Sequence, residues 1–265
     1  MLHNPVGFFD SGWGGLSTLI AARKALPAEN FCYVADCGNA PYGDRSHDFI
    51  VDRALRITRF LFEEQNAKAL VIACNTATAE AIDVLREHYP AKIVLGVEPA
   101  IKPAVEASKN KIIGMISTNR TAHSERYQLL LQRFAANAKV FSQGCPGLME
   151  CVEKGDFTSD ETRALLHRYI DPMVEAGIDS LVLGCTHYPF LAQAIEDIVG
   201  PNVLLYDSSP AVARHLARRL KETDSLNHET QLGNTTFFVS DLNDERQKVA
   251  RRLWKAAVTF KNLPV

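Results

Sequence analysis

Short apolar runs alternate with longer amphipathic stretches through most of this 265-residue chain. The runs VGFF (6–9), ALVIA (69–73) and SLVLG (180–184) are each followed by such a stretch, and residues 76–89 are an example. Apolar runs of this length predict strands buried on both faces, and apolar residues spaced three or four apart predict helices that cover them. The alternation therefore indicates an α/β fold with parallel sheets built from βαβ units.

Several segments of the first half recur in the second half. LVIACNTATA (70–79) parallels LVLGCTHYPF (181–190), and VGFFDSG (6–12) parallels IIGMISTNRT (112–121). Self-similarity of this kind predicts two similar lobes related by a pseudo-twofold, each a mostly parallel sheet flanked by helices, with a cleft between them. The expected divisions are residues 1–97 for the first lobe, 98–207 for the second, and 208–265 for a tail. This tail has one strand-like run and one closing helix, and it is expected to pack back on the first lobe.

Polar residues follow the predicted strands at the points where ligands bind to open parallel sheets. Cys74 and Cys185 end two runs at equivalent positions, so two facing lobes would direct both thiols into one cleft. Short hydroxyl and amide side chains at the same edge suit the carboxylates and ammonium of a small zwitterion. The other strand-end residues are Asp10, Ser11, Pro41, Tyr42, Gly43, Asn75, Thr76, Ser117, Thr118, Thr121, Thr186 and His187.

The two cysteines and the glycine-rich turn each allow a structural and a functional interpretation. A single buried cysteine is more often an inert small hydrophobe, but two at equivalent helix starts favour function, since a helix N-terminus lowers a thiol pKa. His187 either tunes a thiol near neutral pH or caps a helix. DSGWGGL (10–16) is either an anion cradle or a tight turn, with Asp10 or Ser11 as N-cap of a helix over 14–26.

Composition narrows the class of protein. The formal net charge of −2 gives no whole-chain indication of nucleic-acid or acidic-membrane binding. No apolar run approaches the ~20 residues of a membrane span, and residues 1–12 lack the basic region of a signal peptide. We therefore expect a cytoplasmic protein with reduced thiols. No zinc is expected, although Cys32 and Cys37 are suitably spaced, because Cys32 lies in a predicted strand. No cofactor is expected either, because no lysine stands at a strand end where a pyridoxal Schiff base would form.

Five motifs together give the chain a family resemblance. They are FDSGWGGL (9–16), APYGDRS (40–46), IACNTATA (72–79), VEPA (97–100) and GCTHYP (184–189). In this order they resemble the aspartate/glutamate racemase superfamily, and within it the cofactor-independent enzymes that make D-glutamate for peptidoglycan. The resemblance implies two similar α/β lobes with the active site between them, racemisation of L-glutamate to D-glutamate, and pairing of two chains into a homodimer.

The resemblance also implies roles for particular residues. Cys74 and Cys185 are the two acid/base residues on opposite faces of the substrate, with Asp10 near the first and His187 beside the second. A further acidic residue corresponds to Glu153, with Glu150 as the alternative. Substrate contacts are expected at Asp10, Ser11, Pro41, Tyr42, Gly43, Asn75, Thr76, Thr118, Thr121 and Thr186. Trp13 and Asp44 depart from the family pattern, and Trp13 is expected to alter the rim of the cleft.

Three other functions fit parts of the same pattern. The fold could act on aspartate or another acidic amino acid. A cysteine hydrolase would use Cys74 as nucleophile and His187 as base, which leaves Cys185 unexplained. A non-catalytic amino-acid-binding module would bind glutamate without exchanging its Cα proton.

Overall fold

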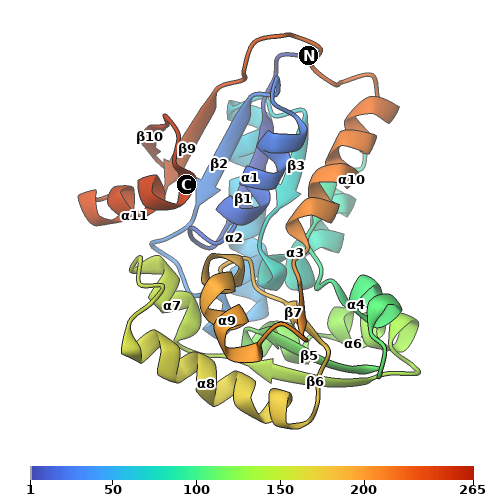
Figure 1. The fold of residues 1–265 in the computed structure, drawn as a ribbon. Helices are drawn as coiled ribbons and strands as arrows, with labels where there is room; N and C mark the ends of the chain where they lie inside the picture. Colours follow the sequence, from blue (N-terminus) through green and yellow to red (C-terminus); the bar gives the residue numbers. More distant parts are fainter. Residues whose placement is uncertain (1) are drawn as a thin grey trace.

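Two parallel sheets, one in each lobe, form the framework of the molecule (Figure 1). The structure is a computed structural model, and it describes residues 2–265. Within this range the first sheet has six strands in the order β10-β9-β2-β1-β3-β4, and the second has four in the order β6-β5-β7-β8. The strands are β1 (Val6–Asp10), β2 (Phe31–Ala35), β3 (Ala69–Ile72), β4 (Ile93–Gly96), β5 (Ile112–Ser117), β6 (Lys139–Gly144), β7 (Ser180–Leu183), β8 (Leu204–Tyr206), β9 (Thr235–Val239) and β10 (Thr259–Asn262).

The two sheets share one topology, which accounts for the repeated segments of the sequence. The order β2-β1-β3-β4 in the first sheet corresponds to β6-β5-β7-β8 in the second. The registers agree as well, since Phe9 pairs with Ile72 and Ile116 pairs with Leu183. Cys74 and Cys185 each lie two residues beyond these paired strand ends. The fold therefore gives the two cysteines equivalent places, one in each lobe, as the sequence predicts.

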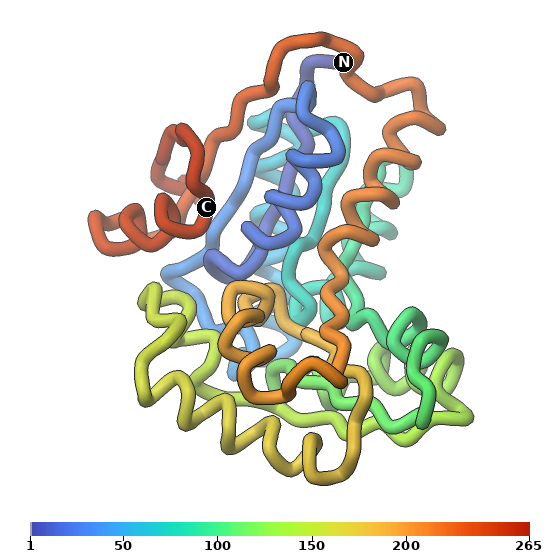
Figure 2. The backbone as a smooth tube through the Cα atoms, in the orientation of Figure 1, coloured from blue at the N-terminus to red at the C-terminus, as the bar shows by residue number. Residues whose placement is uncertain are grey.

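Helices cover both sheets, and two of them cross between the lobes. Helix α4 follows β4 of the first sheet but packs on β7 and α6 of the second lobe, while α10 follows β8 and packs along α1 of the first lobe (Figure 2). The helices are α1 (Leu16–Ala25), α2 (His47–Arg59), α3 (Asn75–His88), α4 (Ile101–Ala107), α5 (Asn119–His123), α6 (Glu125–Phe134), α7 (Leu148–Glu153), α8 (Asp160–Glu175), α9 (Ala192–Val199), α10 (Ser209–Glu222) and α11 (Asp244–Trp254), with short 3₁₀ or π turns η1 (Tyr42–Asp44), η2 (Phe60–Glu64) and η3 (Tyr188–Leu191).

Local chemistry explains where several helices begin. The side chains of Ser46, Ser124 and Ser159 accept N–H hydrogen bonds at the starts of α2, α6 and α8, as N-cap serines do. The predicted N-cap of α1 is wrong, because the helix begins at Leu16 and its N-cap, Gly15, makes no side-chain cap bond. Asp10 instead ends β1 and accepts the N–H of Gly15 from a distance of five residues.

The C-terminal segment contains two strands where the sequence predicted one. Strand β9 pairs with β2, and β10 pairs with β9 at the edge of the first sheet. The residues of β10, TFKN, are largely exposed, so the strand lacks the continuous apolar run that marks the buried strands. Helix α11 follows β9 and lies on the same lobe beside α1.

Trp13 belongs to the core of the first lobe, so the expectation that it shapes the cleft rim is wrong. Its side chain is fully buried and stacks on Tyr33 with ring centroids 6.4 Å apart. It also contacts Phe237 and Phe260 of the C-terminal strands. The bulky indole thus replaces aliphatic packing and ties the β1–α1 turn to β9 and β10.

A buried ion pair supports the loop that carries Pro41, Tyr42 and Gly43. Arg53 donates to both carboxylate oxygens of Asp36 at 2.8 and 2.9 Å, and the Tyr42 hydroxyl donates to the same carboxylate at 2.6 Å. Burial alone would raise the pKa of Asp36, but the hydrogen bonds from Arg53, Tyr42 and Asn39 lower it. The pair is therefore fully charged at neutral pH, and it holds the loop in place through the hydrogen bond from Tyr42 to Asp36.

We expect Asp36→Asn to lower the free energy of unfolding by ~3 kcal/mol, because it leaves the guanidinium of Arg53 buried without its counter-ion. Urea denaturation at pH 7 measures the change. The control is Asp52→Asn, which breaks the exposed pair between Asp52 and Arg56 and should cost less than ~1 kcal/mol. Equal effects of the two substitutions would contradict the conclusion that the buried pair of Asp36 and Arg53 stabilises the fold.

Candidate active site

A small cavity lies between the lobes, where the carboxyl ends of β1, β3 and β7 meet. Its volume is about 20 Å³, close to the space that one water molecule needs. Cys74 of the first lobe and Cys185 of the second both line it. The remaining lining residues are Asp10, Ser11, Pro41, Tyr42, Gly43, Asn75, Thr76, Thr118, Met149, Gly184, Thr186 and His187.

Cys74 is the N-cap of α3 and is almost completely buried. The Ala77 N–H donates to its sulfur at 3.4 Å, and its thiol donates to the Ser11 hydroxyl at 3.9 Å. Burial, followed by the charge of Asp10, raises the pKa of Cys74 well above its usual value, although the Ala77 N–H opposes this. The helix start lowers the pKa of this thiol as expected, but the net shift in the closed site is upward, since burial outweighs one backbone hydrogen bond.

Asp10 is fully buried beside Cys74 at the end of β1. Its Oδ2 accepts N–H groups from Gly15 at 2.8 Å and Gly12 at 3.4 Å, while no group among residues 2–265 bonds Oδ1. Burial raises the pKa of Asp10 to about 6, against the lowering effects of His187 and the Gly15 N–H. The site thus holds a carboxyl that titrates near neutral pH and has one unpartnered oxygen.

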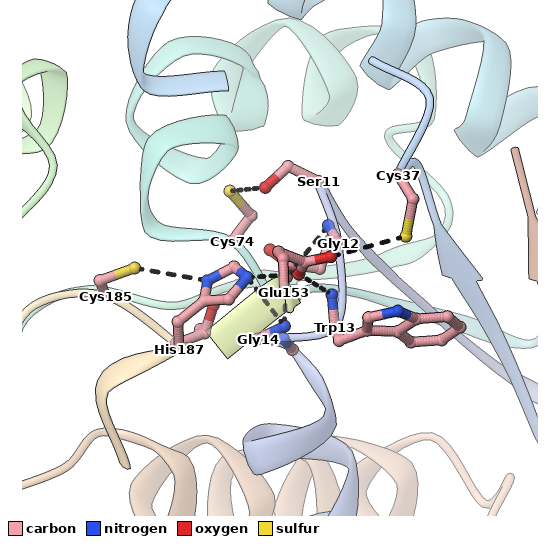
Figure 3. A network of polar contacts seen from close by, with 12 residues as sticks. Ser11, Gly12, Trp13, Gly14, Cys37, Cys74, Glu153, Cys185 and His187 are labelled. Atoms are coloured by element: carbon pink, nitrogen blue, oxygen red, sulfur yellow. Dashed lines mark hydrogen bonds and ion pairs between the residues drawn. The ribbon is translucent and has the colours of Figure 1, made fainter. Parts of the chain in front are cut away.

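The second thiol has a different neighbour, the imidazole of His187. The Nδ1 atom lies 3.6 Å from the Cys185 sulfur, and Nε2 lies 2.7 Å from Glu153 Oε1 (Figure 3). Burial alone would lower the pKa of His187, but its hydrogen bonds with Cys185 and Glu153 hold the pKa well above the ordinary value. An imidazolium at this position stabilises negative charge on the adjacent sulfur.

The β1–α1 turn of the first lobe accommodates this pair from the second lobe. The Trp13 N–H donates to Glu153 Oε1 at 2.5 Å, and a Cβ on Gly12 would lie 2.2 Å from the same oxygen. A Cβ on Gly14 would lie 2.3 Å from the imidazole of His187. The turn therefore needs glycine at both positions, because side chains of the opposite lobe occupy the space.

The structure distinguishes the two candidate glutamates. Glu153 contacts His187, whereas Glu150 lines outer cavities beside α7 and makes no contact with the imidazole. The Gly14 N–H also points at His187 Nε2, at 3.2 Å. A protonated Nε2 cannot also accept a hydrogen bond. The shorter contact, in which Nε2 donates to Glu153, therefore excludes acceptance from the Gly14 N–H. His187 therefore carries its Nε2 proton toward Glu153.

The predicted substrate contacts all line the cavity except Thr121, and the strand-end residue Ser117 does not line it either. Thr121 lies behind Thr76, whose hydroxyl is 3.2 Å from that of Thr121 and 3.0 Å from that of Thr118. These contacts join α3 of the first lobe to the β5–α5 turn of the second.

Three residues at the site were not predicted from the sequence. Met149 and Gly184 line the cavity, and Cys37 is a neighbour of Glu153. The thiol of Cys37 lies 3.9 Å from Glu153 Oε2. Met149 reaches the site from α7 and belongs to no strand-end motif. Two of the three carried a signal, because Gly184 precedes Cys185 in GCTHYP and Cys37 stands two residues after β2.

Neither a metal centre nor a membrane span is found in the described range. No group of three or more His, Cys, Asp or Glu side chains among residues 2–265 is arranged to hold a metal ion. No helix in that range is long and apolar enough to cross a bilayer.

The raised pKa of Asp10 makes stability depend on pH in a direction opposite to that of a salt-bridged carboxylate. Its pKa is 3.8 when unperturbed and about 6 in the fold, so the folded state binds the proton more tightly and stability falls as pH rises from about 4 to 6. We expect Asp10→Asn to stabilise the protein by up to ~3 kcal/mol at pH 8 and by almost nothing at pH 4. Urea titrations at both pH values test this. A gain independent of pH would contradict it.

Known proteins share both the sequence and the arrangement described above. The family model for Asp/Glu/Hydantoin racemase matches residues 16–216. A glutamate racemase from Herpetosiphon aurantiacus is 48% identical over 240 residues, which cover 91% of this chain and 94% of that protein.

Two solved structures superpose along nearly the whole chain. Glutamate racemase isoform RacE1 from Bacillus anthracis has a TM-score of 0.90 at 29% identity and covers 100% of this chain and 99% of that one. Glutamate racemase from Francisella tularensis, solved in complex with D-glutamate, has a TM-score of 0.88 at 29% identity and covers 99% and 98%. The chain belongs to the Asp/Glu/hydantoin racemase family.

Proposed function

We propose that this chain interconverts L-glutamate and D-glutamate, with Cys74 and Cys185 as the two proton-transfer groups. One observation carries the proposal: two thiols from topologically equivalent strand ends line a single cavity between the lobes. A relative that is similar along the whole chain was solved with D-glutamate bound, which supports glutamate as the substrate.

Inversion at Cα requires one proton to leave from one face and another to arrive on the opposite face. A thiolate on one wall removes the Cα proton and becomes a thiol, and the thiol on the other wall donates its proton and becomes a thiolate. Atoms and charge balance without a redox partner, and the reverse reaction exchanges the two roles. Two fixed bases avoid any need to turn the intermediate over within the site.

Each thiol has its own auxiliary group. The carboxyl of Asp10 lies beside Cys74, where it can hold a proton near neutral pH and has Oδ1 free for a substrate ammonium. The imidazolium of His187, held by Glu153, lies beside Cys185 and offsets negative charge on that sulfur. The two bases are therefore supported by groups of opposite charge.

The negative charge that develops on the substrate must be stabilised by the site itself. Asn75, Thr76, Thr118 and Thr186 line the cavity and offer hydroxyl, amide and backbone donors to a substrate carboxylate. Hydrogen bonds of this kind strengthen when water is excluded and charge accumulates on the carboxylate in the transition state. Pro41, Tyr42 and Gly43 close the cavity on the first-lobe side.

The lobes must separate to admit glutamate, because the cavity holds little more than one water molecule. Closure forms polar contacts across the lobes, including Thr76 with Thr118 at 3.0 Å and Arg120 with Glu80 at 3.2 Å. Arg126 adds a further contact, in which its Nη2 lies 2.8 Å from both carboxylate oxygens of Asp83. Single hydrogen bonds and partly exposed ion pairs of this kind are individually weak, which suits a closure that reverses in every turnover.

The biological setting follows from the product. We infer that the D-glutamate serves peptidoglycan precursor synthesis in the cytoplasm and that two chains pair as a homodimer. Aspartate or another acidic amino acid is the second candidate substrate. The hydrolase alternative pairs His187 with Cys74, but the imidazole contacts Cys185 instead.

Removing either thiol should abolish racemisation. We expect Cys74→Ala and Cys185→Ala each to lower kcat by roughly 10²–10⁴-fold in both directions, because proton transfer on one face is lost. Circular dichroism of L- and D-glutamate solutions measures the rate. Cys32→Ala, which removes a buried thiol in β2, is the control and should keep near-normal activity. Full activity of either Cys74→Ala or Cys185→Ala would rule out the two-thiol mechanism.

Isotope exchange separates this mechanism from a one-base enzyme and from a binding module. In D₂O, early turnover of L-glutamate should give D-glutamate with deuterium at Cα, while the remaining L-glutamate keeps its proton. The reason is that the donating thiol carries solvent deuterium and the accepting thiol carries the substrate proton. NMR and chiral chromatography measure both pools, with L-aspartate run in parallel. Protium in the product would indicate one base, and binding without exchange would indicate a binding module.

A further inference from the structure

The end of helix α7 determines where the Glu153 carboxylate lies. Glu153 is the last residue of α7, and the chain then turns through Gly155 in a left-handed conformation with φ of +73°. The N–H groups of Lys154 and Gly155 bond the carbonyls of Glu150 and Val152, which is a glycine-terminated helix end. A shift of this cap would move Glu153 relative to His187.

A side chain of the first lobe holds this cap from outside. Arg252 of α11 donates from Nη1 to the Gly155 carbonyl at 2.6 Å, and its guanidinium lies 4.6 Å from the centroid of the Phe157 ring. A planar guanidinium can make both contacts at once, which a lysine ammonium cannot do equally well. Arg252 thus contacts residues on the C-terminal side of Glu153, although its helix, α11, belongs to the opposite lobe (Figure 1).

Helix α11 is itself anchored to the first lobe, so the position of this lobe can affect the position of Glu153 through α11. Trp254 is buried against Phe237 of β9, with ring centroids 5.4 Å apart. Arg246, two turns earlier, donates to the Cys37 carbonyl at 3.1 Å, and the Cys37 thiol contacts Glu153 Oε2. The glutamate is therefore enclosed by groups that α11 holds from two sides.

We propose that Arg252 is a positioning residue for proton transfer at Cys185, acting through the Gly155 cap to hold Glu153 against His187. This inference rests on the two-thiol mechanism proposed above. Arg252 does not line the cavity and touches no reacting atom. Because it spans the lobes, its hydrogen bond holds only while they are together, so closure of the lobes and alignment of Glu153 occur in one step.

The test measures which of the two proton transfers is slowed. L- and D-glutamate have equal free energies, so kcat/KM must fall equally in both directions. The primary isotope effect of Cα-deuterated substrate, however, need not change equally in the two directions. It rises in the direction whose first step uses the impaired thiol and falls in the direction where that thiol donates last. Cys185→Ser and Cys74→Ser give the two opposite reference patterns, and Glu153→Gln should follow Cys185→Ser.

We expect Arg252→Met, which keeps the apolar stem but loses the donors, to lower kcat about two- to tenfold. Its isotope effects should differ between the two directions, with the larger effect in the same direction as for Cys185→Ser, and KM should change little. Arg252→Lys should restore part of the rate. Arg251→Met is the matched control, because Arg251 packs on Phe260 within its own lobe and should leave rate and isotope effects unchanged.

The outcomes separate the two proposals. If the serine variants fail to give opposite patterns, the two-thiol mechanism itself is wrong. If they do but Arg252→Met behaves like Arg251→Met, or loses rate with equal isotope effects, the positioning role of Arg252 is wrong. Should Arg252→Met fold poorly, Phe157→Leu removes the ring under the guanidinium and must give the same inequality.

Discussion

The hydrogen bond between His187 and Glu153 lies within the second lobe, and the glycine turn of the first lobe packs on both side chains, so this contact joins the two lobes at the candidate active site. Gly12 and Gly14 leave no space for a side chain, because Glu153 and His187 occupy it. The turn resembles an anion cradle in sequence, and it is one, but the anion at the Trp13 N–H is a carboxylate of the chain itself. The carboxylate that bonds the imidazole of His187 is therefore also held by a backbone N–H of the opposite lobe.

The scaffold is nearly symmetric, but the electrostatics around the two sulfurs are not. Equivalent strand ends give Cys74 and Cys185 equivalent places, as the proposed proton transfers on opposite faces of one carbon require. Asp10, however, adds negative charge near Cys74, and His187 adds positive charge near Cys185. The proposed reaction needs one thiolate and one thiol when substrate is bound, and the unequal neighbours make the surroundings of the two sulfurs electrostatically different.

The sequence predicts the elements that have a regular apolar pattern or a clear polar end. It misses the features that depend on packing between segments far apart in the chain. The two-lobe α/β fold and the place of both cysteines follow from apolar runs that repeat with the same polar ends. Strand β10 was missed because an exposed edge strand has no apolar run. The burial of Trp13 was missed because its partners, Tyr33 and Phe237, come from other strands. Met149 reaches the site only through the packing of α7, which no local pattern records.

Burial in the closed cavity works against the chemistry that the cavity must perform. It raises the pKa of Cys74 well above its usual value and that of Asp10 to about 6, so the empty closed site favours the neutral thiol of Cys74 and makes Asp10 harder to ionise. The Ala77 N–H cannot offset this alone. In the proposed mechanism the missing positive charge arrives with the substrate, whose ammonium can face the free Oδ1 of Asp10 and stabilise both the carboxylate and a nearby thiolate. A site that ionises fully only when occupied avoids exposing a reactive thiolate to water between turnovers.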